Sequence, residues 1–161
     1  MILQKLREFL DVQNIRYVII SHSMAFTAQE IAQSAHIPGR EIAKTVIVKI
    51  DGRMIMAVLP ASEMVDFNLL KAITGTADVT LANEDEFTAL FPECERGAMP
   101  PFGNLYGLEV IAADSLADDA DIAFNAGTHR ELVRMAFKDF MEVTHPRVAK
   151  FTVRRKSSGE G

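Results

Sequence analysis

At 161 residues the chain is long enough for one domain, since a division into two would leave neither part enough surface to bury. Its hydrophobic share of 48% and charged share of 24% are ordinary for a globular protein, and no run of eighteen apolar residues predicts a membrane span. A formal charge of −5 excludes a protein that coats nucleic acid through bulk positive charge. Without a secretory signal, and with a single cysteine, Cys94, a cytoplasmic protein is expected.

The first part of the chain predicts a helix, a strand and a second helix. Apolar residues recur at three- and four-residue spacing over residues 2–13, which predicts an amphipathic helix. The β-branched and aromatic residues 17–20 predict a short strand. Thr27 and Glu30 have the spacing of a capping box, so a helix is expected from there to about His36.

The next segment predicts a β-hairpin. Residues 45–50 and 54–59 flank Asp51-Gly52, a dipeptide that favours a type I′ turn, and Pro60 ends the second arm. Because both arms are almost continuously apolar, we expect central strands that are buried on both faces.

The remaining elements follow in irregular order. Helices are expected near 66–74, 84–91 and 139–143, and strands near 79–81, 108–113, 122–124 and 131–137. This order, with helices irregularly placed among six or seven strands, indicates a mixed sheet rather than a regular series of βαβ units. We expect this single compact domain to cover residues 1–156, with 157–161 as a disordered tail.

The end of the chain is strongly basic, whereas the remainder is acidic. The basic residues, with no acidic residue among them, are Arg147, Lys150, Arg154, Arg155 and Lys156. Two interpretations remain open, a local contact with the phosphates of a nucleic acid and a solvated basic end.

Three segments are candidates for chemistry. Lys44 precedes an apolar strand, where its ammonium could enter a cleft and hold a phosphate, a carbonyl or an oxyanion, or could simply cap the strand in solvent. In Gly97-Ala98-Met99-Pro100-Pro101-Phe102-Gly103, glycines permit a ligand close to the backbone while prolines fix it, although an ordinary surface turn would also fit.

The third segment is Asn125-Ala126-Gly127-Thr128-His129, in which a glycine turn after a strand presents a histidine. His129 could transfer a proton near neutral pH, or could be bonded to the backbone for structure. His22 is a weaker candidate, and His36 and His145 are interpreted as structural. The acidic neighbours of Cys94 make it a poor nucleophile, and no spacing of Cys and His predicts a metal site.

These three segments, in this order and spacing, resemble the YbaK/ProX family. That family includes the editing insertion domain of bacterial prolyl-tRNA synthetase and its free-standing relatives. The resemblance extends from the first helix to about Phe151, and it includes the helix start at Thr27. It implies a compact α+β domain with a mixed, partly barrel-like sheet of six or seven strands and flanking helices. It also implies hydrolysis of an aminoacyl ester at the 3′ end of a tRNA, without metal or cofactor.

The resemblance also implies the residues of the site. Lys44, Gly97 and His129 match the positions regarded as catalytic. Residues expected to bind substrate are His22, Thr45, Met99, Pro100, Pro101, Phe102, Gly127 and Thr128. The Pro-Pro-Phe-Gly sequence is similar to that of editors of small amino acids, which implies Ala on tRNA-Pro as the substrate and prolyl-tRNA synthetase as a partner.

A competing hypothesis is a binding module of the same fold, which holds tRNA or a nucleotide without hydrolysing it and partners a synthetase. The lysine, the glycine loop and the histidine favour the enzyme, but a binding site could keep the same contacts. Deacylation of a panel of mischarged tRNAs distinguishes the two hypotheses.

Overall fold

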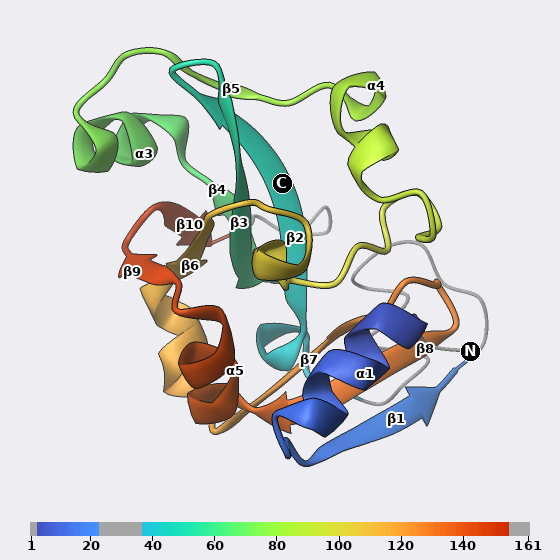
Figure 1. Ribbon diagram of the computed structural model, residues 1–161. Helices are drawn as coiled ribbons and strands as arrows, with labels where there is room; N and C mark the ends of the chain where they lie inside the picture. Colours follow the sequence, from blue (N-terminus) through green and yellow to red (C-terminus); the bar gives the residue numbers. More distant parts are fainter. Residues whose placement is uncertain (1–2, 23–36, 155–161) are drawn as a thin grey trace.

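The computed structural model describes residues 3–22 and 37–154, which form four helices and three sheets (Figure 1). The helices are α1 (Gln4–Val12), α3 (Phe67–Thr74), α4 (Glu84–Phe87) and α5 (Phe137–Thr144). The strands are β1 (Tyr17–Ser21), β2 (Ala43–Ile50), β3 (Arg53–Pro60), β4 (Glu63–Val65), β5 (Val79–Leu81), β6 (Val110–Ala113), β7 (Asp121–Asn125), β8 (Glu131–Ala136), β9 (Arg147–Ala149) and β10 (Thr152–Arg154). The α+β class is confirmed.

The centre of the molecule is the predicted hairpin. In the five-stranded sheet, ordered β5-β2-β3-β6-β9, β2 pairs with β3 from Ala43 opposite Pro60 to Ile50 opposite Arg53. Asp51 and Gly52 both have positive φ, 52° and 80°, as a type I′ turn requires. The hairpin and its turn are therefore confirmed.

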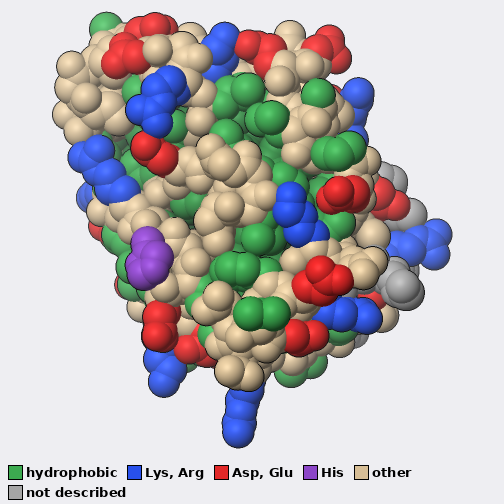
Figure 2. Space-filling model, in the orientation of Figure 1, with side chains coloured by type: hydrophobic (Ala, Val, Ile, Leu, Met, Phe, Trp, Pro, Cys, Tyr) green, Lys and Arg blue, Asp and Glu red, His purple; other side chains and the backbone are tan. Residues whose placement is uncertain are grey.

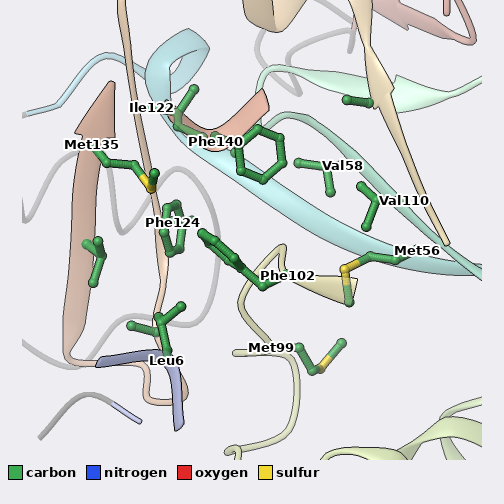
Figure 3. Packing of buried hydrophobic residues seen from close by; sticks show 14 of the residues in the cluster. Leu6, Met56, Val58, Met99, Phe102, Val110, Ile122, Phe124, Met135 and Phe140 are labelled. Carbon is green, nitrogen blue, oxygen red and sulfur yellow. The ribbon is translucent and has the colours of Figure 1, made fainter. Parts of the chain in front are cut away.

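Side chains of the hairpin alternate between two apolar clusters. Ile47, Met56 and Val58 face the larger cluster, which also contains Leu6 of α1 and Phe140 of α5 (Figure 3). Their neighbours Val48, Ala57 and Leu59 face a second cluster, which contains Leu70 of α3. The expectation of central strands buried on both faces is confirmed, because a helix-bearing layer covers each side.

The three-stranded sheet, ordered β1-β8-β7, lies against the hairpin sheet. It joins that sheet through a parallel bridge between Ile42, just before β2, and Ala123 of β7. α1 packs on it through Leu6 and Leu10, which lie in the larger cluster together with Phe124 of β7. This junction of β2 with β7 brings together the segments that the sequence analysis singled out.

The predicted single sheet of six or seven strands is corrected. The described strands form three separate sheets, of three, two and five strands, and they do not close into a barrel. The three unpredicted strands, β4, β9 and β10, have three residues each, too few to show a hydrophobic period. The helix expected at 84–91 ends at Phe87 and continues as a 3-10 turn, Thr88–Leu90.

Some expectations lie outside the described residues, namely the helix from Thr27 to His36 and the tail 157–161. None of the helices that the structure describes is both long and apolar enough to cross a membrane.

Candidate functional site

Lys44 is the second residue of β2, half-buried and opposite Leu59 of β3. Two residues earlier, Ile42 forms an isolated parallel bridge with Ala123 of β7, which brings the start of β2 close to β7, the strand that ends at Asn125. Side chains alternate along a strand, so Lys44 shares the face of Ile42. Thr45, also half-buried, leaves the strand on the opposite face, the face of Ala43 and the larger apolar cluster.

The glycine loop has a buried arm and an exposed tip. Met99 is almost fully buried, and the rings of Phe9, Phe124 and Phe140 surround Phe102 at centroid distances of 6.0, 5.4 and 5.7 Å (Figure 3). Pro100 and Pro101 are buried as well, whereas Gly97 is exposed at the tip with φ of +83°. The Pro-Pro-Phe arm thus anchors the loop in the core and leaves Gly97 at the surface.

The loop is hydrogen-bonded to the turn that carries His129. Glu95 N–H donates to the Gly127 carbonyl at 2.8 Å, and Gly127 N–H donates to the Ala98 carbonyl at 2.9 Å. A Glu95 carboxylate oxygen accepts from the His129 N–H at 2.7 Å. The structure therefore brings Gly97 and His129 together, since a Cβ added at Gly97 would lie 3.6 Å from Cε1 of the His129 ring.

The His129 side chain is turned inward onto the loop. Only 4% of the residue is exposed, and its Nε2 lies 2.6 Å from the carbonyl oxygen of Arg96. A carbonyl can only accept, so Nε2 carries the hydrogen of this bond. The ring is thus engaged with the loop backbone.

Residues next to α1 and β1 also form hydrogen bonds with this turn. Leu3 N–H donates to the Ala126 carbonyl at 2.9 Å, next to α1. His22 N–H, directly after β1, donates to the Arg130 carbonyl at 2.8 Å, and Thr128 Oγ1 accepts from Arg130 N–H at 3.3 Å. His22, Gly127 and Thr128 therefore gather around His129.

Two residues of the site were not singled out from the sequence. Asn125 ends β7, which lies close to the start of β2, and its Oδ1 is buried with no donor at hydrogen-bonding distance within the described part of the chain. Asn125 belongs to the quoted motif, so the motif itself could have indicated it. Glu95 was considered only as an acidic neighbour of Cys94, and its bonds to a turn more than thirty residues away leave no local sequence pattern.

Cys94 is a poor nucleophile, as its neighbours predicted, although for a different main reason. Burial is the largest cause that raises the pKa of the Cys94 thiol, and the charge of Glu93 adds to it. Because the folded pKa is raised, the thiolate fraction at pH 7–8 is lower than for an ordinary cysteine. We expect iodoacetamide to alkylate Cys94 of the native protein at pH 8 more slowly than Cys94 of the protein unfolded in urea, and equal rates would contradict this. We also expect Cys94→Ser to keep full activity, and a loss of activity would show that the thiol is required.

Two further expectations from the sequence concern His145 and metal binding. His145 ends α5 in the left-handed conformation, with φ of 47°, which fits the structural role expected for it. Within residues 3–22 and 37–154, no group of three or more His, Cys, Asp and Glu side chains is placed to hold a metal ion.

Comparisons with known proteins agree with this geometry. A family model described as an aminoacyl-tRNA editing domain matches residues 22–143. The multifunctional Ser/Thr-tRNA deacylase ProXp-y of Escherichia coli K12 is 25% identical over 153 residues, which cover 92% of this chain and 91% of that protein. The proline–tRNA ligase of Staphylococcus saprophyticus is 36% identical over 95 residues, 58% of this chain and only 16% of the ligase.

Solved structures show the same fold. A hypothetical protein, APE2540, superimposes with a TM-score of 0.83 at 21% identity, over 93% of this chain and all of that one. A proposed trans-editing enzyme for prolyl tRNA synthetase gives a TM-score of 0.79 at 19% identity, over 95% of this chain and 96% of that chain. The match of the family model over most of the chain, with the motif residues gathered at the end of β7, shows that this protein belongs to the aminoacyl-tRNA editing domain family.

Proposed function

We propose that this protein is a trans-editing aminoacyl-tRNA deacylase, which hydrolyses the ester between a wrongly attached amino acid and its tRNA. One observation carries the proposal: the exposed Gly97 tip is bonded to the His129 turn at the end of β7, the strand beside Lys44. Family membership and the similarity to ProXp-y along almost the whole chain support the same reaction class.

The reaction needs positioning and charge stabilisation more than a strong nucleophile, because an aminoacyl ester is already activated. Water attacks the carbonyl carbon, the bond to the ribose oxygen breaks, and that oxygen takes up a proton from the water. The products are the free amino acid and the tRNA with its hydroxyl restored. The backbone N–H groups at Gly97 would hold the carbonyl oxygen as it becomes negative.

The Gly97 amide is suited to this task. Within the part of the chain that the structure describes, Gly97 N–H donates to no protein acceptor, and the residue is exposed. Lys44, on the neighbouring strand, would anchor the terminal nucleotide or polarise the ester with its ammonium. Asn125 Oδ1, buried at the end of β7, would accept a hydrogen bond from a hydroxyl or amino group of the substrate.

The substrate that we propose is a small amino acid such as Ala on tRNA-Pro, with prolyl-tRNA synthetase as a partner. The Pro-Pro-Phe-Gly sequence of the loop and the similarity to a proline–tRNA ligase support this choice. ProXp-y is named for Ser and Thr, which are also small. A small cavity would reject a bulkier correct amino acid by steric clash.

The test is deacylation of Ala-, Ser- and Thr-charged tRNAs, with correctly charged Pro-tRNA-Pro as the negative control. Rapid release of one mischarged amino acid, with Pro-tRNA-Pro left intact, is the expected result. Binding of these tRNAs without any hydrolysis would refute the enzyme and leave the binding module instead.

We also propose that the basic segment 147–156 assists tRNA binding. Arg154 ends β10 and lies opposite Glu63 of β4, and β4 starts three residues after Pro60, which is opposite Ala43. Strand β10 therefore ends near the open end of the β2–β3 hairpin, where Lys44 also lies. On the face drawn in Figure 2, Lys and Arg side chains are scattered among Asp and Glu, so phosphate contacts depend on such local groups.

Deletion of residues 155–161 removes Arg155 and Lys156 and leaves β10 intact. We expect weaker tRNA binding and a slope of log affinity against log salt that is flatter by roughly 1.4–1.8, since each phosphate contact adds about 0.7–0.9. Turnover at saturating tRNA should change little. Deletion of 157–161 alone is the control, and an unchanged slope in the longer deletion would show a merely solvated end.

A further inference from the structure

We infer that Glu95 is a positioning residue, which holds the His129 turn against the glycine loop so that the His129 ring fixes the peptide carrying the Gly97 N–H. This inference rests on the proposed deacylase function, because that N–H is the proposed donor to the ester oxygen. Glu95 itself touches neither substrate nor reacting atoms.

Glu95 connects the two segments through its N–H and its carboxylate, while its carbonyl closes a turn within the loop. Its N–H donates to the Gly127 carbonyl at 2.8 Å, and its own carbonyl accepts from Ala98 N–H at 3.0 Å. Its carboxylate accepts from the His129 N–H at 2.7 Å, which is a hydrogen bond to a charged acceptor and therefore stronger than a neutral one. Glu95 thus makes two of the hydrogen bonds that join the loop to the buried turn, beside the bond from Gly127 N–H to the Ala98 carbonyl.

The His129 ring carries this restraint to the tip of the loop. Its Nε2–H donates to the Arg96 carbonyl at 2.6 Å. The described chain has no cis peptide, and in a planar trans peptide the C=O and N–H groups point in opposite directions. The bond that fixes the Arg96 carbonyl therefore also fixes the direction of the Gly97 N–H, away from His129.

Such a restraint is needed because the tip is a glycine. Gly97 has φ of +83° and no side chain, so without an external bond the Arg96–Gly97 peptide can rotate at little cost. Hydrogen-bond donors stabilise a developing charge well only when they already point at it. The hydrogen bonds from Glu95 through His129 to Arg96 fix the direction of the Gly97 N–H, although none of these three residues supplies a reacting group.

The kinetic test compares Glu95→Ala, Glu95→Gln and the control Glu93→Ala on a mischarged tRNA that the wild type deacylates. We expect kcat of Glu95→Ala to fall about 10- to 100-fold with KM changed less than about twofold, because a misplaced donor affects the transition state more than binding. Glu95→Gln should recover most of the loss, since its amide oxygen can accept the same N–H. Glu93 is an exposed neighbour, and Glu93→Ala should behave as wild type.

A structural readout that needs no activity accompanies the kinetics. NMR of the wild type should show a hydrogen on Nε2 of His129 and a single signal for the Gly97 amide. In Glu95→Ala the Gly97 amide signal should shift or broaden. In Glu95→Gln it should resemble that of the wild type. A His129 ring that carries its hydrogen on Nδ1 alone would overturn the inference, and so would an unchanged Gly97 amide in Glu95→Ala.

The outcomes separate the two proposals. If the wild type deacylates no tRNA, the proposed function fails, while the NMR comparison still decides whether Glu95 orders Gly97. If the wild type is active and Glu95→Gln loses as much kcat as Glu95→Ala, charge rather than the hydrogen bond matters, and the positioning role is wrong.

Discussion

Replacement of Lys44 by alanine is expected to lower the deacylation rate by ~10²–10³, which is the usual loss when one preorganised electrostatic contact is removed. Lys44 is a half-buried cation near the junction of β2 and β7. The fold should persist, because the residues around it in β2 keep their pairing with β3. The measurement is kcat/KM on the mischarged tRNA that the wild type hydrolyses fastest, together with the Tm.

Lys49→Ala is the matched control, since Lys49 lies on the same strand but pairs with Glu86 at 2.7 Å, away from the β7 junction. It should keep wild-type turnover. If a folded Lys44→Ala protein matches it in turnover, Lys44 has no part in the mechanism.

Gly97→Val is expected to abolish most turnover while the protein stays folded. The new Cβ would lie 3.6 Å from the His129 ring, and its branches would occupy the surface where the ester must approach the backbone. A valine at φ of +83° is also strained, which costs on the order of 1–3 kcal/mol and should lower the Tm. Turnover per folded molecule should fall far more than this strain explains.

Gly107→Val separates the two effects, because Gly107 is exposed, has φ of +71° and would meet nothing within 4 Å. It should lose similar stability and keep its activity. Were Gly97→Val to melt earlier yet show normal turnover per folded molecule, Gly97 would be structural only.

Sequence periodicity predicted the long elements well, but of the strands with only three residues it predicted β5 (Val79–Leu81) and missed β4, β9 and β10. The hairpin around Asp51-Gly52 was predictable because its arms are long, apolar and joined by a dipeptide that tolerates positive φ. Strands β4, β9 and β10 exist through pairing with distant segments, such as Thr152 with Val65, and three residues carry no period of their own.

The candidate site could be predicted as a set of residues but not as an arrangement. The motifs named Lys44, Gly97 and His129, whose roles remain proposals, whereas Glu95 lies 34 residues from the His129 amide it binds and could not be found by spacing. Likewise, only the structure shows that Phe102, expected to bind substrate, is fully buried among aromatic rings.

The two apolar clusters on either side of the hairpin have a consequence for how the molecule opens. Residues 48–50 of β2 pair with both β3 and β5, and residues 56–58 of β3 pair with both β2 and β6, so we expect the amide hydrogens of these stretches to exchange mainly through unfolding of the whole domain. β1 is an edge strand with Val18 and Ile19 exposed, so its amides can exchange through local opening. Lys44 lies on the same strand, β2, and pairs with Leu59 of β3, so we expect local fluctuations at the β1 edge to leave its backbone in place.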